Sequence, residues 1–375
     1  MRRTRVLVVD DEPGMLRSVE RVLGDEMHLV CLSSPRQALE AIASFTPDVA
    51  LLDIRMPEMS GFELMDRLVT ALPDLDVIFM TGSVDELDSQ LIRAIRAKAF
   101  YFIQKPFDRE VLRALVDRCV DARWLMTENV RHVRRLEREL ADARAFQLST
   151  LPADRAVLAG VSIAAGYQPC AELGGDFYDY AATADGRVAL LVADVVGHGV
   201  SAAMLTAVVK SAFHAAHVDD YDPVAVAERV SAGMSSFGPR RFVTLVCVRI
   251  SADRHSIEYV NAGHPPGLLG SHRRGVKLLE DTGPMIGSGL PDQSWHAQQA
   301  RLHAHGRVLL YTDGLTDLDT PNGPFGRQPL LAAVESTTPD SNLTAFLHDQ
   351  VRALTAGAPL LDDVTFLVAW SDPNR

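Results

Sequence analysis

The first part of the chain alternates short apolar runs with amphipathic stretches. Four runs are almost entirely apolar, at residues 5–10, 48–54, 76–81 and 100–105. Strands that are buried on both faces of a parallel sheet have this uniform character. Segments 13–24 and 34–45 instead carry apolar residues at helical spacing, and Ser34 followed by Pro35 is typical of a helix N-terminus. The pattern predicts a doubly wound α/β domain over residues 1–120.

Residues 108–151 contain neither Gly nor Pro and are rich in Arg, Glu, Leu and Ala. Their apolar positions follow mostly three- and four-residue steps: Leu112, Leu115, Cys119, Ala122, Met126, Val130, Val133, Leu136, Leu140 and Ala143. This spacing predicts one long helix, in which residues 121–151 form a coiled-coil linker and pair with a second copy in a parallel homodimer. The steps slip between Met126 and Leu136, which strains a regular supercoil. The alternative is a monomeric helix that lies on its own domain.

Beyond Pro152 the pattern changes to strand-like runs with fewer helical segments between them. The runs cover residues 187–195, 242–250, 256–263, 307–315 and 364–370, and the helical segments cover 201–216, 223–234 and 343–354. Sheets covered by helices account for this mixture. We therefore expect an α+β sandwich domain over residues 152–375.

The composition argues against several classes of protein, including nucleic acid binders, zinc proteins and membrane proteins. Of 375 residues, 49 are Asp or Glu and 37 are Lys or Arg, so the formal net charge is −12. This balance disfavours phosphate-backbone binding, and no basic recognition helix follows the first domain, so we expect no nucleic acid partner. The four cysteines are scattered, which indicates reduced packing residues and not a zinc site. No apolar run suits a signal peptide or a membrane span, so we expect a cytoplasmic protein without membrane contact.

Polar residues follow the apolar runs of the first domain at the points where the strands should end. They are Asp10 and Asp11, Asp53, Thr81 and Lys105. The carboxyl ends of parallel strands meet at one edge of the sheet, where ligands of this fold class bind. Three carboxylates there could hold Mg²⁺, while the lysine and the hydroxyl neutralise a phosphoryl group on the central carboxylate.

Four segments, "VVDDE", "LLDIRMPEMSGFEL", "MTG" and "KPF", resemble the receiver domain of two-component response regulators. The resemblance implies that Asp53 accepts a phosphoryl group from a cognate histidine kinase. It also implies roles for other residues: Mg²⁺ binding for Asp10, Asp11 and Asp53, phosphoryl contacts for Thr81 and Lys105, and the aromatic switch position for Phe102. The chain departs from the family at Lys98–Ala99, where Gly-Ala is usual, so an altered loop is expected before the last strand.

Carboxylates recur in four separated segments of the second domain, and in three of these segments an Asp stands next to Gly or another Asp. They are Asp176, Asp194, the pair Asp313 and Asp317, and the pair Asp362 and Asp363. Shared carboxylates suit a centre of two hard divalent cations, and the lack of a His-rich or Cys-rich set favours Mg²⁺ or Mn²⁺ over Zn²⁺. The alternative is that the Asp-Gly segments are only turns.

Five motifs in this domain, "GGDFYD", "ADVVGHGVSAAM", "VNAGHPPGLL", "YTDGLTD" and "DDVTFLV", resemble metal-dependent serine/threonine phosphatases of the PP2C class. The resemblance covers residues 155–371 and is to the bacterial branch of sporulation protein SpoIIE and the stress phosphatase RsbU. It implies these ligands for two Mn²⁺ or Mg²⁺ ions: Asp176, Asp194, Asp313, Asp362 and the carbonyl of Val195. Asp363 is the less favoured alternative to Asp362, and Val196 replaces a serine that is common in the branch.

Together the motifs predict a two-component response regulator whose output is a metal-dependent protein serine/threonine phosphatase. Water activated by the two metals would attack the phosphorus, and His198 or His264 could protonate the leaving group, unless they only brace neighbouring loops. By resemblance, the substrate is a phosphorylated anti-sigma-factor antagonist of a partner-switching pathway. The rivals are a non-enzymatic adaptor that binds a sigma factor or antagonist protein, and a phosphatase that acts on a small molecule.

Overall fold

The fold is seen in a computed structural model of the chain. The structure describes residues 3–82, 101–197, 199–238, 240–270, 275–287, 293–303, 305–320, 323–336, 343–354 and 360–371. The chain forms two compact units, Met1–Arg135 and Leu136–Arg375.

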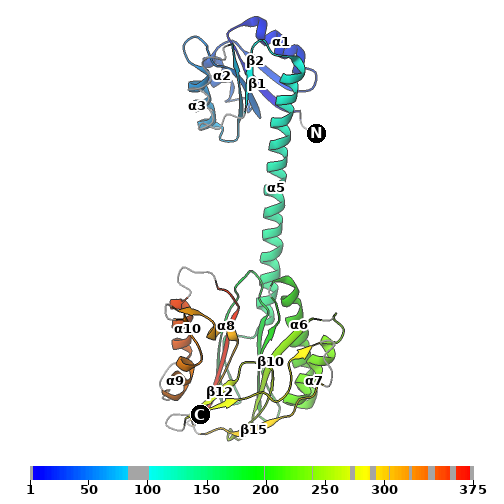
Figure 1. Ribbon diagram of the computed structural model, residues 1–375, viewed down its shortest axis with the longest axis vertical. Coiled ribbons are helices and arrows are strands. Elements are labelled where there is room, and N and C mark those ends of the chain that lie inside the picture. The colour runs from blue at the N-terminus through cyan, green and yellow to red at the C-terminus, as the bar shows by residue number, and fades with distance from the viewer. Residues whose placement is uncertain are drawn as a thin grey trace. The chain divides into compact units, whose positions relative to one another are not determined.

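The first unit is built on a parallel sheet (Figure 1). Its strands are β1 (Arg5–Val9), β2 (His28–Leu32), β3 (Val49–Asp53), β4 (Asp76–Thr81) and β5 (Tyr101–Gln104). Over the described residues the strand order is β2-β1-β3-β4-β5, with every pair parallel. This order reverses direction next to β1, so the ends of β1 and β3 flank the point where doubly wound folds bind ligands. The prediction of a doubly wound α/β domain is confirmed.

Helices cover both faces of this sheet. They are α1 (Pro13–Leu23), α2 (Pro35–Ala41), α3 (Gly61–Ala71) and the first part of α5 (Arg109–Thr150). The Ser34 side chain accepts a hydrogen bond from Gln37 N and caps α2, as its position before Pro35 predicts. One core lies under α2 and α3, and the other lies under α1 and α5. Strand β2 and helix α3 were not predicted.

Helix α5 has two different surfaces along its length. Near its start, Leu112 and Cys119 are buried in the core of the first unit, and Arg123 Nε donates to Asp76 Oδ2 at 2.7 Å. Farther along, the apolar positions from Met126 to Leu136 are exposed. The predicted seam is therefore wrong for its first positions, because they pack against the sheet of their own unit. The exposed remainder stays a predicted coiled coil.

The second unit contains two antiparallel sheets among its described residues. The strands are β6 (Arg155–Leu158), β7 (Val161–Gln168), β8 (Asp176–Ala182), β9 (Val188–Val195), β10 (Phe242–Ile250), β11 (Ser256–Ala262), β12 (Gly267–Gly270), β13 (Val276–Leu279), β14 (Ile286–Gly287), β15 (Gln298–Arg301), β16 (Arg307–Tyr311) and β19 (Val364–Ser371). One sheet has the order β15-β11-β10-β9-β8, with β14 on β10, and the other has the order β13-β12-β16-β19-β7-β6. A short hairpin joins β17 (Asp319–Thr320) to β18 (Gly323–Pro324).

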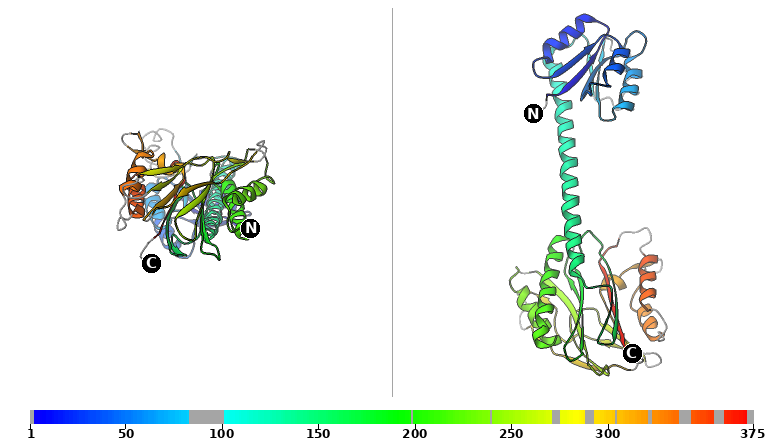
Figure 2. Two further views of the ribbon diagram at one scale, coloured as in Figure 1. Left: turned by 90° about the horizontal axis from the view of Figure 1, so that it is seen from below. Right: turned by 180° about the vertical axis from the view of Figure 1, so that it is seen from behind.

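The two sheets pack face to face, and helices cover their outer faces (Figures 1 and 2). The helices are α6 (Val200–Ala215), η1 (Ala216–Asp219), α7 (Pro223–Met234), α8 (Asp313–Thr316), α9 (Gln328–Ser336) and α10 (Leu343–Leu354). A core of β-strand side chains lies between the sheets. Helices α6 and α7 pack on the first sheet, and α9 and α10 pack on the second. This confirms the α+β sandwich. None of the helices in the described part of the chain has the length and apolar character that a bilayer crossing requires.

Candidate functional sites

An acidic cluster lies at the carboxyl edge of the parallel sheet. Asp10 follows β1, Asp11 is next to it, and Asp53 ends β3. Parallel register places Val9 beside Leu52, so the two strand ends lie side by side. One carboxylate oxygen from each of the three aspartates lies within 4.8 Å of the others. Asp10 and Asp53 are buried, whereas Asp11 is exposed to solvent.

Lys105 reaches this cluster from the end of β5. Its Nζ lies 2.6 Å from Asp10 Oδ2 and 2.9 Å from Asp53 Oδ1, and its backbone N donates to the Thr81 carbonyl at 2.6 Å. Burial raises the pKa of Asp53, Lys105 opposes that rise, and the charges of Asp10 and Asp11 add to it. Although burial acts in the other direction, hydrogen bonds to Asp10 and Asp53 raise the pKa of Lys105. The lysine is thus cationic, and it is held against Asp53, the phosphoryl acceptor that the sequence predicts.

The donor set of this cluster suits a hard divalent cation. Three carboxylates face one ammonium group, so the cluster keeps a negative charge in a partly buried place. Thr81 is buried at the end of β4. Phe102 stacks on Phe79, with ring centroids 5.5 Å apart. Lys98–Ala99, the predicted departure from the receiver pattern, lies outside the described residues.

In the second unit, Asp176 and Asp194 face each other at the ends of adjacent strands. Asp176 begins β8, and it is paired in register with Asp194 of β9. Asp176 is buried and also bonded to the other sheet, because Thr312 Oγ1 donates to Asp176 Oδ2 at 2.7 Å. Thr365 N donates in turn to Thr312 Oγ1 at 3.0 Å. Asp313 follows Thr312 directly, at the start of α8. The site therefore lies where the two sheets meet.

The two adjacent aspartates before β19 have different roles. Asp363 is buried and accepts hydrogen bonds from Cys170 N at 2.8 Å, Gly175 N at 2.5 Å and Asp176 N at 3.4 Å. Its oxygens are therefore used to hold the loop that leads into β8. Asp362 is exposed, and it adds to the negative potential at Asp194 and Asp313. This division favours Asp362 over Asp363 as the candidate ligand.

Glycines permit a close approach of backbone at this place. A Cβ on Gly175 would lie 2.5 Å from the carbonyl oxygen of Val195, and one on Gly314 would lie 2.0 Å from the carbonyl oxygen of Asp363. Any side chain at either position would push these segments apart. The Gly-Asp and Asp-Gly pairs therefore bring Asp176, Asp313 and the Val195 carbonyl to one place, which a simple turn would not require.

The carboxylates raise one another's pKa. Burial raises the pKa of Asp194 to about 7, and the charges of Asp313, Asp362 and Asp363 add to the rise. Burial and then Asp194 raise the pKa of Asp176, which hydrogen bonds from Thr365 and Thr312 oppose. Burial and then Asp362 raise the pKa of Asp313. Within the described part of the chain, the charged groups that shift these three are all carboxylates, so the donor set fits divalent cations with oxygen ligands.

The structure separates the two candidate histidines. His264 is buried, its Nε2 faces the Tyr311 carbonyl at 3.1 Å and therefore donates, and its Nδ1 accepts from Thr244 Oγ1 at 2.8 Å. Burial lowers its pKa to about 3, so the ring is the neutral imidazole at neutral pH and lacks the acidic imidazolium proton that a general acid needs. His264 thus braces β10 against β16. His198 lies outside the described residues.

Sequence reasoning missed Thr312 and the loop-holding role of Asp363. The available signal for Thr312 was its position directly before Asp313, and for Asp363 its position directly after Asp362. Asp179, the second carboxylate of the "GGDFYD" motif, points to the opposite face of β8 from Asp176, because it lies three positions farther along a strand whose side chains alternate. It pairs there with Lys210 Nζ of α6 at 3.0 Å. That pair joins helix to sheet.

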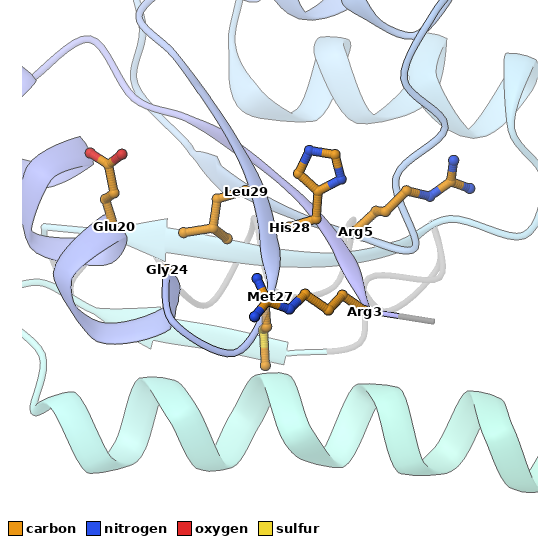
Figure 3. A pocket seen from close by; sticks show the side chains of 7 residues that line it. All are labelled: Arg3, Arg5, Glu20, Gly24, Met27, His28 and Leu29. Atoms are coloured by element: carbon orange, nitrogen blue, oxygen red, sulfur yellow. The ribbon is translucent and has the colours of Figure 1, made fainter. Parts of the chain in front are cut away.

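A pocket of about 580 Å³ lies elsewhere on the first unit (Figure 3). It is lined by Arg3, Arg5, Glu20, Gly24, Met27, His28 and Leu29. Arg5 and His28 begin β1 and β2, so the pocket is at the sheet edge opposite to Asp10 and Asp53. It belongs to neither acidic cluster.

The protein consists of a doubly wound α/β domain and a PP2C-like sandwich domain, and each domain contains one cluster of carboxylates. Residues 6–117 match the family model of the response regulator receiver domain, and residues 184–370 match that of Stage II sporulation protein E (SpoIIE). The chain therefore contains a receiver domain and a SpoIIE PP2C-type domain. Both resemblances predicted from the sequence are confirmed.

Characterised relatives match one domain each. The phosphoserine phosphatase RsbP of Bacillus subtilis (strain 168) is 33% identical over 186 residues, which are 48% of this chain and 46% of RsbP. The DNA-binding transcriptional regulator NtrC of Escherichia coli (strain K12) is 40% identical over 121 residues, 32% of this chain and 25% of NtrC. The chain thus spans less than half the length of either relative. The SiaA-PP2C domain of Pseudomonas aeruginosa shares the fold, with a TM-score of 0.54, 22% identity, and coverage of 64% of this chain and 99% of that domain.

Proposed function

We propose that this protein is a response regulator whose output is a metal-dependent protein serine/threonine phosphatase. One observation carries the proposal: aspartates from four distant segments meet where the two sheets join, and their charges raise one another's pKa. Such repulsion is costly unless cations bind. The similarity of this domain to the phosphoserine phosphatase RsbP supports the reaction.

The proposed ligands of two Mn²⁺ or Mg²⁺ ions are Asp176, Asp194, Asp313, Asp362 and the carbonyl of Val195. Bound divalent ions of this kind acidify water and stabilise charge on a phosphate ester. The chain's own contribution is orientation. Thr312 fixes one oxygen of Asp176, and Asp363 fixes the backbone before it. Rigid carboxylates avoid the cost of reorganising ligands during the reaction.

In the receiver, we propose that Asp53 accepts a phosphoryl group from a histidine kinase, with Mg²⁺ on Asp10, Asp11 and Asp53. Lys105 is in place to neutralise the phosphoryl oxygens, since its Nζ already contacts Asp53 at 2.9 Å. Thr81 and Phe102 keep their proposed roles as a phosphoryl contact and as the switch position. Their places, at the end of β4 and against Phe79, are compatible with those roles.

The proposed substrate is a phosphorylated anti-sigma-factor antagonist of a partner-switching pathway, and the similarity to RsbP supports a phosphoserine. We also propose a homodimer through α5. Its support is the row Met126, Val130, Val133 and Leu136, whose side chains are between 47% and 65% exposed. Apolar residues at this spacing on a charged helix gain free energy by pairing with a second helix.

The test is phosphate release from a phosphoserine antagonist protein with Mn²⁺, with and without a small phosphodonor. We expect turnover by the wild type and a loss of at least about a hundredfold in Asp313→Asn, because one ligand of the centre is gone. Asp253→Asn, an exposed position elsewhere in the unit, is the matched control. A chain that is inert with Mn²⁺ and Mg²⁺ yet binds the antagonist is an adaptor and contradicts the proposal.

A further inference from the structure

Cys170 lies beside the two aspartates that precede β19. It follows β7 by two residues, whereas Asp362 and Asp363 lie just before the last strand. One ligand atom from each of the three side chains lies within 4.8 Å of the other two. The backbone N of Cys170 also donates to Asp363 Oδ1 at 2.8 Å, across 193 positions of sequence. The fold alone brings these groups together, so the spacing of the cysteines does not reveal them.

The Cys170 thiol is hydrogen-bonded to the Asp363 carboxylate. Burial raises the pKa of this thiol to about 11, and the charge of Asp363, the hydrogen bond and the charge of Asp362 add to the rise. The side chain is therefore a protonated thiol at neutral pH and not a reactive thiolate. A cation that displaces the thiol proton can bind the sulfur and a carboxylate together.

A second observation at the same loop points to a polar ligand. Tyr167 Oη is buried and has no hydrogen-bond partner among the described residues. A Cβ on Gly174 would lie 2.6 Å from this oxygen and 2.7 Å from Asp363 Oδ2, so both atoms border the same glycine. Buried polar atoms without a partner are rare in proteins, and a bound water or ion is a usual explanation. The hydroxyl therefore indicates a polar ligand close to Asp363.

The donor set of this group differs from the oxygen ligands that Mn²⁺ and Mg²⁺ prefer. One thiol and two carboxylates suit Zn²⁺, which binds sulfur and oxygen ligands in a tetrahedral site. Tetrahedral zinc places its ligand atoms about 3.5 Å apart. Asp362 is exposed, so its carboxylate has room for the small movement that this requires. Asp363 accepts three backbone N–H groups, and a carboxylate offers about four acceptor positions, so one remains for a cation.

We infer that Cys170, Asp362 and Asp363 form a zinc site that shares Asp362 with the proposed Mn²⁺ or Mg²⁺ centre. When Zn²⁺ binds, its bond to Sγ forms as the S–H bond breaks, and the proton leaves to solvent without any change of oxidation state. Zinc at this place holds Asp362 away from the other centre and so inhibits phosphate release. Zinc binding depends on these three side chains alone, whereas the inhibition rests on the proposed function.

The experiment titrates the full chain, freed of metal and kept reduced, with Co²⁺, which occupies zinc sites and absorbs in the near ultraviolet when a thiolate binds it. We expect a thiolate-to-cobalt band in the wild type that Zn²⁺ abolishes, and no band in Cys170→Ser, which replaces the sulfur by oxygen. The acidic cluster of the receiver contains carboxylates alone, so Co²⁺ bound there gives no such band. Cys31→Ser, which removes the half-buried thiol of the receiver, is the matched control and should keep the band.

Competition between Zn²⁺ and Co²⁺ gives the dissociation constant of Zn²⁺. It should rise at least about tenfold in Cys170→Ser, because losing a ligand costs no less than losing a group that orients one. Should Cys170→Ser fail to fold, Cys170→Ala removes the same sulfur, and the same loss of the band and of affinity is expected.

Phosphate release tests the sharing of Asp362. Zn²⁺ is added in the presence of Mn²⁺, and the activity of each chain is expressed relative to its own activity without Zn²⁺. The Zn²⁺ concentration that halves the activity should rise at least about tenfold in Cys170→Ser and stay within about twofold of wild type in Cys31→Ser.

The absence of a thiolate band in the wild type, or a band that persists in folded Cys170→Ser, overturns the inference. A Cys170-dependent band in an active chain that Zn²⁺ does not inhibit also overturns it, because Asp362 is then not shared. A Cys170-dependent band in a chain that never releases phosphate supports the zinc site and refutes the proposed phosphatase.

Discussion

The aspartates of the second unit occupy positions where ionisation is unfavourable in the metal-free chain. Asp176 is buried opposite Asp194. Thr312 donates a hydrogen bond to the Asp176 carboxylate, and the backbone N of Asp176 donates one to Asp363, so the segment is held in place without its charge being neutralised. For the proposed metal centre, stability of the metal-free chain and metal affinity therefore oppose each other, because carboxylates that repel one another without a cation are the proposed ligands when a cation binds.

Asp194→Asn should stabilise the metal-free chain at alkaline pH. The pKa of Asp194 is raised from 3.8 to about 7. An acid whose pKa rises on folding costs stability when it ionises, so the cost appears as pH rises above the unfolded value and is complete above the folded one. In EDTA at pH 8 we expect the variant to gain at least about 1 kcal/mol over wild type, with no difference near pH 4. Thermal unfolding at both pH values is the measurement, and a variant no more stable at pH 8 contradicts the mutual repulsion.

Asp53→Ala should abolish phosphoryl uptake from acetyl phosphate. Asp53 ends β3 beside Lys105 Nζ, whereas Asp10 is fully buried and is held by the same lysine. Among the described carboxylates of the cluster, Asp53 is the one that contacts Lys105 and also occupies the strand end that the receiver resemblance assigns to the acceptor. Intact-mass spectrometry of the labelled chain is the measurement, with exposed Asp25→Ala as the control. Labelling that persists in Asp53→Ala would place the acceptor elsewhere.

At the scale of elements, the strands that the sequence predicts in the first unit are those that are buried on both faces. β1, β3 and β4 are buried along nearly their whole length, so their composition alone identifies them. β2 is an edge strand whose residues are mostly half-buried, and the mixed "HLVCL" carries no clear period. The predicted seam of α5 is wrong at Leu112 and Cys119. The same helical spacing of apolar residues is produced by packing against a second helix and by packing against the sheet of the same unit, so the sequence cannot distinguish the two.

Site residues follow the same logic. Aspartates next to glycine or to another aspartate stand out in the sequence, but Thr312 and Gln147 act through hydrogen bonds to residues more than 25 positions away, and only the fold defines those partners. Asp363 could be named as a candidate, but its bonds to the loop before β8 could not. The sequence therefore identifies the candidate ligands more readily than the residues that position those ligands by hydrogen bonds.

Helix α3 offers a test at this scale. Its N-terminus is a capping box, in which Glu63 N donates to Ser60 Oγ at 3.3 Å and Ser60 N donates to Glu63 Oε2 at 3.0 Å. Ser60→Ala removes one half of this exchange and should lower the free energy of unfolding of the receiver transition by about 1 kcal/mol. Urea unfolding of the full chain is the measurement, with Ser44→Ala as the control. An unchanged receiver transition would mean that packing of Phe62 and Leu64 alone fixes the start of the helix.

At the scale of the whole molecule, α5 is the continuous element that belongs to both units. Its first turns are part of the receiver core, through Leu112 and Cys119, and its last turns bind the loop before Asp176, through Gln147. Between them lie the exposed residues from Met126 to Leu136. A change at one end therefore has a covalent, hydrogen-bonded path to the other.

Val133→Asp should weaken the dimer and uncouple phosphatase activity from the state of Asp53. Val133 is 47% exposed in the single chain, and a carboxylate facing its own copy across a coiled coil is repelled. Sedimentation and phosphatase assays with and without a phosphodonor are the measurements. Arg134→Asp, next to Val133 but outside the apolar row, is the control and should remain dimeric. A dimeric, normally regulated Val133→Asp chain would require the signal to travel without the exposed row.

The position of β19 has a consequence for how the protein is made. This strand lies inside its sheet between β16 and β7, and the residues just before it supply Asp362 and Asp363. Asp176, whose backbone N donates to Asp363, precedes it by 187 residues in the sequence. A chain whose synthesis stops before residue 362 lacks two aspartates of the proposed metal site and the strand that connects β16 to β7. If the proposed phosphatase activity is correct, interrupted translation products therefore cannot release phosphate outside the control of the receiver.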